Sequence, residues 1–381
     1  MKIAQIAPLI ESVPPRLYGG TERVVSWLTE ELVRQGQDVT LFASGDSVTK
    51  ARLVSCSVHA LRHDPHVRDP IPHYMLMLDQ VRRRADEFDV LHFHFDPFQF
   101  PLFRPIAART LTTLHGRQDL PDLPILYDEF DDMPLVSISN AQRAPVAHAN
   151  FATTIHHGLP PRLHKPSYEP RGGYLAFLGR ICPEKRPDHA IAIARAAGIP
   201  LRIAAKVDKV DEAYFREMIA PLLSGSGVEF VGEINEAEKT EFLGQAQALL
   251  FPIDWPEPFG LAMIEAMACG TPVLAFRRGS VPEIVDDGVT GYVVDAPDEA
   301  VRALPALLAL DRRAVRRRFD ERFSATRMAG DYIELYRAMA QNASRRDAKA
   351  SARRHPIDGI SVSGARLHAD GNIAAGDGVA S

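Results

Sequence analysis

The 381-residue sequence has few cysteines and no long apolar run. Its three cysteines (Cys56, Cys182 and Cys269) are widely spaced, so they predict neither a disulfide framework nor a cysteine metal site. They indicate a reducing compartment, and we expect a cytoplasmic protein. No stretch approaches the ~18 apolar residues that a membrane-spanning helix needs. The opening residues MKIAQIAPLI contain too short an apolar region for a signal peptide, and we interpret them as a first buried strand.

The sequence also lacks an excess of basic charge. Its formal net charge is -5 at pH 7, which is evidence against a nucleic-acid partner, because nucleic-acid-binding domains are usually basic. Hydrophobic residues make up 46% and charged residues 24%, as is usual for a globular protein. A single core rarely extends through a chain of this length, so two domains are expected.

Short apolar segments alternate with amphipathic segments along most of the chain. Within 21–36, Val24, Leu28 and Leu32 form one helical stripe, and Gly36 is well placed to end the helix. The segments that we predict to be strands lie at 2–9, 38–44, 89–95, 110–116, 135–140, 152–158, 174–179, 200–207, 228–232, 248–253, 271–276 and 291–294. Such alternation predicts an α/β fold built from parallel βαβ units.

One proline-rich segment interrupts this alternation. It reads LPPRLHKPSYEPRGG over 159–173, and its four prolines, charges and glycine pair predict a linker. We therefore divide the chain into two Rossmann-like domains, at 1–160 and 174–325, joined by the linker 161–173.

The C-terminal part of the chain changes character twice. Residues 311–340 are helical in pattern and rich in arginine. The stretch RRAVRRRFDER could be a basic patch for acidic lipid, but we interpret it as a solvated helix face, because acidic residues are interleaved. Residues 341–381 are small and polar, and we expect disorder there.

Two loops after predicted strands could hold an anion. In YGGTERVV, Gly19 and Gly20 let the backbone approach a ligand, and a helix that begins at Thr21 or Glu22 would attract phosphate through its unpaired N–H groups. A glycine pair alone is more typical of an ordinary turn, and the G-x-G-x-x-G pattern of dinucleotide sites is missing. In FLGRICPEKRPD, Arg180 and Lys185 follow a predicted strand and suit a diphosphate, although they could also be plain surface charges.

The stretch EPFGLAMIE places two carboxylates around a predicted turn. Pro258 disfavours helix at Glu257, so the helix should begin near Phe259 or Gly260 and expose the N–H groups of its first residues to an anion. Glu265 then lies within its first two turns. Carboxylates accept hydrogen bonds from vicinal hydroxyls, and a nucleotide sugar carries such hydroxyls on both sides of a diphosphate. A helix cap plus a partly buried glutamate is the simpler alternative for either residue alone.

These motifs together resemble a known family. EPFGLAMIE is similar to the E-x7-E element of the family-four retaining glycosyltransferases, which have the GT-B fold. YGGTERVV, TLHG, VSISNAQR, FLGRICPEKRPD, VEFVGEI and EIVDDGVTGYVVD follow in the expected order. The resemblance covers about residues 1–340. It implies an N-terminal acceptor domain and a C-terminal donor domain whose parallel sheets face a central cleft, with a helix at about 326–340 packing back on the N-terminal domain.

The resemblance also implies roles for individual residues. Gly20 would lie under the sugar diphosphate, Arg180 and Lys185 would neutralise it, and backbone groups of Phe259, Gly260 and Leu261 would donate to it. Glu265 would hold the ribose and Glu257 the donor sugar. His115 would lie near the donor sugar and the reacting centre. Lys206 and Ile234 would border the base. His115 taken alone is equally consistent with an ordinary histidine at a strand end.

The implied reaction is transfer of a sugar from a UDP-sugar or GDP-sugar to an acceptor hydroxyl, with retention and without a metal or cofactor. The acceptor could be a glycan, a lipid-linked molecule or a small molecule, and the basic segment 82–84 could touch a membrane transiently. A non-catalytic nucleotide-sugar-binding protein and a related phosphorylase remain alternatives. A metal-dependent hydrolase is another, since His92, His94 and Asp96 lie on one face of a strand. We prefer to place His94 in the acceptor cleft.

Overall fold

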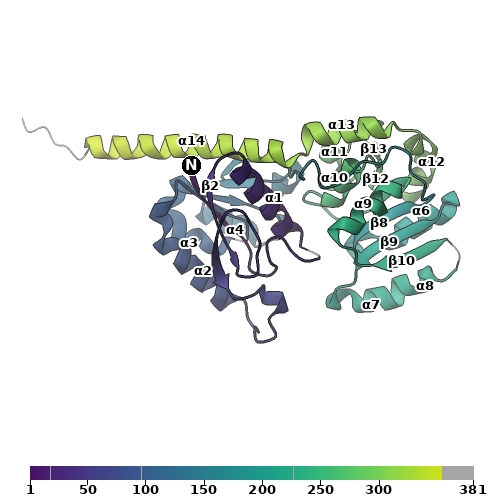
Figure 1. Cartoon of the computed structure of the whole chain (residues 1–381), viewed down its shortest axis with the longest axis horizontal. Coiled ribbons are helices and arrows are strands. Elements are labelled where there is room, and N and C mark those ends of the chain that lie inside the picture. The colour runs from purple at the N-terminus through teal and green to yellow at the C-terminus, as the bar shows by residue number, and fades with distance from the viewer. Residues whose placement is uncertain (18, 96, 226, 354–381) are drawn as a thin grey trace, which may run out of the picture.

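Two parallel β-sheets, one in each half of the chain, form the framework of the computed structural model (Figure 1). The structure describes residues 1–17, 19–95, 97–225 and 227–353. Each sheet is flanked by helices, so the α/β architecture with two Rossmann-like halves that the sequence predicts is confirmed.

The N-terminal sheet has seven strands in the order β3-β2-β1-β4-β5-β6-β7. They are β1 (Lys2–Ile6), β2 (Asp38–Ser44), β3 (Arg52–Ser57), β4 (Val90–Phe93), β5 (Thr110–Thr113), β6 (Leu135–Ser137) and β7 (Phe151–Thr154). The α-helices of this half are α1 (Gly20–Arg34), α2 (Ile71–Arg83), α3 (Phe100–Phe103), α4 (Leu123–Glu129) and α5 (Asn140–Arg143). Short 3-10 helices are η1 (Leu61–His63), η2 (Ala85–Glu87), η3 (Pro97–Gln99), η4 (Arg104–Arg109) and η5 (Ala144–Val146).

The C-terminal sheet has six strands in the order β10-β9-β8-β11-β12-β13. They are β8 (Leu175–Arg180), β9 (Leu201–Lys206), β10 (Val228–Gly232), β11 (Ala248–Phe251), β12 (Val273–Phe276) and β13 (Gly291–Val294). Its helices are η6 (Pro183–Lys185), α6 (Pro187–Ala197), η7 (Lys209–Asp211), α7 (Glu212–Tyr214), η8 (Phe215–Ile219), α8 (Ala220–Leu223), α9 (Glu236–Gln245), α10 (Leu261–Ala268), α11 (Val281–Ile284), α12 (Pro297–Leu308) and α13 (Arg312–Arg322).

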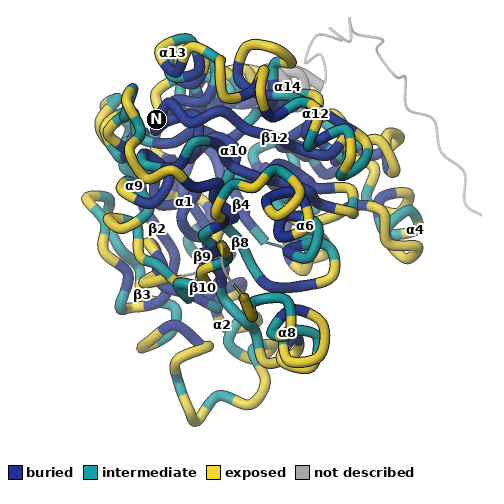
Figure 2. The backbone as a smooth tube through the Cα atoms, turned by 90° about the vertical axis from the view of Figure 1, so that its right-hand side faces the viewer, coloured by how far each residue is buried: buried dark blue, intermediate teal, exposed yellow. Residues whose placement is uncertain are grey.

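Both sheets reverse their direction of winding at the first strand. In the N-terminal sheet β1 pairs with β2 on one side and with β4 on the other, and β8 pairs likewise with β9 and β11. The strands beside β1 and β8 are buried in apolar clusters, which Figure 2 shows as dark blue segments at the centre of the molecule. Ligands of such sheets bind beyond the carboxyl ends of the strands at this reversal.

The helix α14 (Ala325–Arg353) returns from the C-terminal half and packs on the N-terminal half, against α1, β4 and η4 (Figure 1). Tyr332 and Tyr336 on this helix are buried there. The helix continues past residue 340, although we expected disorder from 341 onwards. The rest of that expected tail, residues 354–381, lies outside the described residues.

The arginine-rich helix α13 is not a simply solvated face, so that interpretation is wrong for two of its arginines. Arg312 is buried and donates to the carbonyl oxygens of Ser167 at 2.7 Å, Gly244 at 3.0 Å and Ala246 at 3.0 Å. Arg316 donates to the carbonyl oxygens of Pro161, His164 and Ala268. The two guanidinium groups therefore fasten the irregular segment 161–173 to the C-terminal half.

Candidate functional site

A cavity of about 480 Å³ lies between the two halves and receives residues from both. It is lined by all of the residues predicted to form the site: Gly19, Gly20, His115, Arg180, Lys185, Lys206, Ile234, Glu257, Phe259, Gly260, Leu261 and Glu265. The structure thus brings these residues together, and their roles remain to be tested. Arg180, Lys185 and the first residue of α10 all line this cavity.

Two helices from different halves begin at the cavity. The helix α1 begins at Gly20 and α10 at Leu261, and a Cβ atom added to Gly20 would lie 3.6 Å from Cδ1 of Leu261. Gly260 precedes α10 with φ 82°, and a Cβ there would lie 2.6 Å from Cε of Met263, so only glycine fits without rearrangement. The first N–H groups of both helices have no intrahelical acceptor, which makes this end of the cavity a seat for an anion.

Lys185 is held beside Glu257 at this seat. The two side chains form an ion pair, and Nε1 of Trp255 donates to Oε2 of the same carboxylate at 2.8 Å. The Lys185 ammonium also lies 5.2 Å from the Trp255 ring centroid and 5.4 Å from that of Phe251. Because Glu257 is only 8% exposed, an uncompensated charge there would be costly, and Lys185 balances it.

The backbone of this turn is fixed from two directions. The hydroxyl of Ser139, in the N-terminal half, donates to the Pro258 carbonyl oxygen at 2.7 Å. Gly279 lies so close that a Cβ atom there would be 2.3 Å from the Glu257 carbonyl oxygen. A side chain at 279 would therefore displace the Glu257–Pro258 segment.

The second group of cations lies at the ends of β8 and β9. Arg180 lies 3.4 Å from Asp211 and 3.6 Å from Asp208, and Lys206 lies 2.9 Å from Asp208. Burial alone would raise the pKa of Asp208, but the Lys206 and Arg180 charges outweigh it and hold that pKa below its usual value. Asp208 therefore orients both cations beside the cavity while remaining ionised.

Glu265 belongs to a chain of charges that crosses between the halves. Its carboxylate accepts from Lys239 at 2.7 Å, Lys239 lies 3.6 Å from Glu236, and Glu236 pairs with Arg23 of α1. Burial would raise the pKa of Glu265, but Lys239, His164 and Arg23 outweigh it and hold the pKa low. The carboxylate is thus an ionised acceptor at neutral pH.

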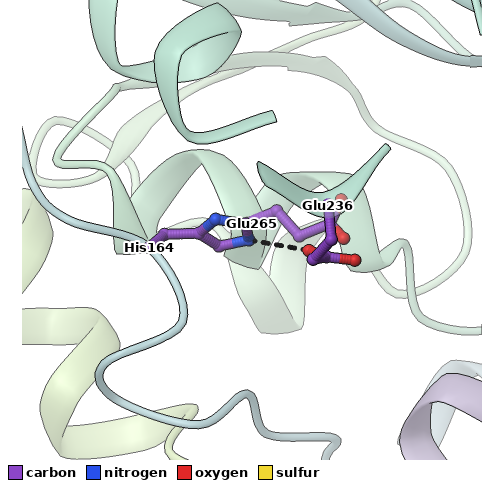
Figure 3. A group of neighbouring side chains, drawn as sticks. All are labelled: His164, Glu236 and Glu265. Carbon is purple, nitrogen blue, oxygen red and sulfur yellow. Dashed lines mark ion pairs between the residues drawn. The ribbon is translucent and has the colours of Figure 1, made fainter. Parts of the chain in front are cut away.

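Glu265, Glu236 and His164 are close enough to ligate one metal ion, as Figure 3 shows. Their neighbours make them a poor metal site, because Lys239 and Arg23 already neutralise both carboxylates. A divalent ion would have to displace these cations or lie beside them. We therefore assign no metal to this cluster.

His115 lines the cavity against a second histidine. Its ring stacks on His157 with centroids 5.3 Å apart and planes 18° apart, and His157 meets Phe259 edge-on at 4.8 Å. Burial lowers the pKa of His115 to about 3, and burial with the neighbouring His115 lowers that of His157 well below its usual value. Both rings are therefore neutral at physiological pH, which favours hydrogen bonding over proton transfer as the role of His115.

The metal-hydrolase alternative and the placement of His94 in the acceptor cleft are both wrong. His92 and His94 are buried and do not line the cavity. Every ring nitrogen of the pair has a hydrogen-bond partner, namely Tyr336, Thr113, Gln5 and His115. No lone pair is left for a metal ion. Asp96 lies outside the described residues.

Sequence reasoning missed several residues of the cavity, namely Arg23, His157, Glu233, Lys239 and Trp255. Arg23 and Trp255 could have been suspected, since each lies within three residues of a motif glycine or glutamate. Lys239 carries no comparable signal, because it reaches Glu265 only when α9 packs beside α10. The sequence suggests no role for His157, which the structure places against His115 and Phe259.

Two Rossmann-like halves on either side of one cavity form the architecture of the GT-B class. Residues 164–323 match the family model described as glycosyl transferases group 1, and residues 18–132 match that described as glycosyltransferase family 4. The matches lie one in each half and together cover more than half of the chain. The chain therefore belongs to the family-4 glycosyltransferases.

Individual relatives agree with this assignment. The chain is 29% identical over 283 residues to D-inositol 3-phosphate glycosyltransferase of Mycobacterium sp. (strain KMS), covering 63% of this chain and 60% of the relative. It is 24% identical over 370 residues to N-acetyl-alpha-D-glucosaminyl L-malate synthase of Bacillus anthracis, covering 84% and 93%. The crystal structure of AviGT4, a glycosyltransferase involved in avilamycin A biosynthesis, superimposes with a TM-score of 0.67 at 26% identity, covering 89% and 98%. The chain thus spans only about 60% of the length of the mycobacterial relative.

None of the helices in the described part of the chain combines the length and apolar character needed to cross a bilayer.

Proposed function

We propose that this protein transfers a sugar from a nucleoside-diphosphate sugar to an acceptor hydroxyl, with retention of anomeric configuration and without a metal ion. One observation carries the proposal: Arg180, Lys185 and the beginnings of α1 and α10 surround a single cavity. Four sources of positive potential at one point suit a diphosphate better than a neutral ligand.

The charge of the leaving group explains how this arrangement would accelerate transfer. As the anomeric bond breaks, the diphosphate gains negative charge, which Arg180, Lys185 and the amides of Gly260 and Leu261 would stabilise more strongly than in the ground state. In the ligand-free protein Lys185 is paired with Glu257. Donor binding would transfer Lys185 to the diphosphate and free Glu257 to accept hydrogen bonds from the sugar hydroxyls.

The other side chains would hold the two ends of the donor. Glu265 would accept from the ribose hydroxyls after exchange with Lys239, and Lys206 and Ile234 would border the base. His115 would lie near the donor sugar. His115 and His157 have lowered pKa values, so neither is a good base for the acceptor hydroxyl. We therefore propose that the acceptor hydroxyl attacks the same face of the sugar that the diphosphate leaves, and that the departing phosphate takes its proton.

The acceptor would enter from the N-terminal half. The mycobacterial and Bacillus relatives are named for the small molecules D-inositol 3-phosphate and L-malate, so small hydroxylated acids belong in the first set of acceptors to be tested. Membrane contact through 82–84 has weaker support, because Arg83 pairs with Asp79 and Arg84 with Glu87.

The expected reducing compartment is consistent with Cys56, Cys182 and Cys269, all of which are free thiols.

Binding and turnover of donors test the proposal together. A thermal-shift panel of UDP-sugars and GDP-sugars is expected to show one nucleotide that raises the melting temperature, since a ligand stabilises the state that binds it. The same donor should then be hydrolysed or transferred, and NMR of the product should show the donor's anomeric configuration. Binding of a donor without turnover of any acceptor would identify a non-catalytic binder instead. Phosphate-dependent turnover would identify a phosphorylase.

Chelation provides a separate prediction about the metal. Excess EDTA is expected to change the donor turnover rate by less than about twofold, because side chains and helix N-termini supply the positive charge that a metal would otherwise supply. The rate should be measured again after Mg²⁺ or Mn²⁺ is added back. Loss of activity with EDTA and its recovery with either ion would contradict metal independence and return attention to His164, Glu236 and Glu265.

A further inference from the structure

A chain of buried hydrogen bonds joins His115 to the helix α14. Nε2 of His115 lies 3.1 Å from Nδ1 of His94, and Nε2 of His94 lies 2.6 Å from Oε1 of Gln5. Nε2 of Gln5 in turn lies 3.1 Å from the Tyr336 hydroxyl, on α14. Gln5, His94 and Tyr336 are at most 1% exposed. The chain therefore passes through the interior of the N-terminal half without contact with water.

The direction of each hydrogen bond follows from the amide of Gln5. Its Oε1 can only accept, so Nε2 of His94 carries a proton and donates to it. Burial lowers the pKa of His94 well below its usual value, and the ring is therefore neutral with an unprotonated Nδ1. That nitrogen can only accept from Nε2–H of His115.

The other end of the network is compatible with this direction. Nε2 of Gln5 donates to the Tyr336 hydroxyl, which is then free to donate to Nδ1 of His92 at 2.7 Å. Nε2–H of His92 donates to the Thr113 hydroxyl at 2.7 Å. In this arrangement each hydrogen bond along the path has one donor and one acceptor, and no two donors face each other.

We propose that Gln5 and His94 are positioning residues that hold His115 as its Nε2–H tautomer, so that its Nδ1 accepts a hydrogen bond from a hydroxyl of the bound substrate. His115 makes no second side-chain hydrogen bond among the residues that the structure describes, so its Nδ1 remains available. The acceptance of a substrate hydroxyl rests on the proposed function. The tautomer itself does not, because it is a property of the ligand-free protein.

The tautomer can be measured directly in the full-length protein. Long-range proton–nitrogen NMR of ¹⁵N-histidine-labelled protein, with His115 assigned by its loss in His115→Asn, is expected to show an unprotonated Nδ1 and a protonated Nε2. The opposite pattern would mean that the Gln5 amide is reversed, and it would overturn the proposal.

Two variants distinguish an effect of the hydrogen bonds from Gln5 through His94 to His115 from a general effect of core packing. Gln5→Leu removes the acceptor of His94 and is expected to give His115 signals from both tautomers. Thr113→Val is the matched control, since it is equally buried and removes the hydroxyl partner of His92 and of Tyr332, but leaves the bonds between Gln5, His94 and His115 in place. It should leave the His115 tautomer unchanged. Equal disturbance of His115 by both variants, or by neither, would contradict the proposal.

Kinetics then link the tautomer to the substrate. Gln5→Leu is expected to lower kcat/KM for the donor by roughly tenfold, about the loss of one hydrogen bond, while Thr113→Val stays within about twofold. An unchanged kcat/KM in Gln5→Leu, despite mixed tautomers, would overturn the role toward substrate. A wild-type protein with no turnover would count against the proposed function alone, and the NMR result would stand.

Discussion

The Lys185→Ala variant is expected to turn over its donor about 10³-fold more slowly than the wild-type protein, by analogy with the loss of other groups that stabilise transition-state charge. Lys185 is the cation closest to the carboxylate Glu257 and shares the cavity with both helix beginnings. Its removal would leave the developing charge on the diphosphate to Arg180 and the backbone amides. The effect should fall on kcat more than on KM, because the missing charge matters most in the transition state.

Steady-state kinetics of donor hydrolysis or transfer would measure this loss. Lys209→Ala is a suitable control, since Lys209 is exposed on the same half and does not line the cavity. Lys185→Arg should recover part of the activity, because it restores the charge but not the compact ammonium. If Lys185→Ala kept more than about a tenth of wild-type activity, the diphosphate would not be held where we place it.

The fold could be predicted where burial leaves a clear pattern in the sequence. β4 and β11 are buried at every position and are apolar except for His92 in β4, so their existence could be predicted. β3 was not predicted, because this edge strand has no fully buried position and its few apolar residues are flanked by the polar residues Arg52, Ser55 and Ser57. The helix beyond residue 340 was missed for a different reason. A helix already anchored by Tyr336 extends at little cost, even through a small and polar sequence.

The residues of the site likewise fall into those with a local sequence signal and those without one. Arg180, Lys185 and Glu257 could be identified because each lies next to a strand end or a turn that the local sequence predicts. Arg23 reaches Glu236 from the other half, and Lys239 reaches Glu265 from a neighbouring helix, so both contacts depend on packing that no local sequence pattern indicates. The hydrogen-bond chain behind His115 likewise joins Gln5 to Tyr336, which are 331 positions apart.

Arg312 is a buried charge that connects several segments of the C-terminal half. The residue is 8% exposed, and its guanidinium donates to four acceptors at 3.0 Å or less, which are the carbonyl oxygens of Ser167, Gly244 and Ala246 and the hydroxyl of Thr271. Burial lowers its pKa to about 10, so the group is still protonated at neutral pH. Within the described residues no carboxylate forms an ion pair with it, so its charge is balanced by the carbonyl dipoles and the Thr271 hydroxyl.

Arg312→Met is therefore expected to lower the free energy of unfolding of this half by about 3 kcal/mol, since it leaves several buried carbonyl groups without a donor. That loss corresponds to a fall of roughly 6–12 °C in melting temperature for a domain of this size. Arg317→Ala is the matched control on the same helix, because Arg317 is 63% exposed and pairs only with Asp311 at 3.6 Å. Its loss should cost less than about 0.5 kcal/mol. Thermal melting followed by circular dichroism would compare the two variants. Equal melting temperatures would show that the methionine side chain replaces the guanidinium without penalty, and that the segment 161–173 is held in place by other contacts.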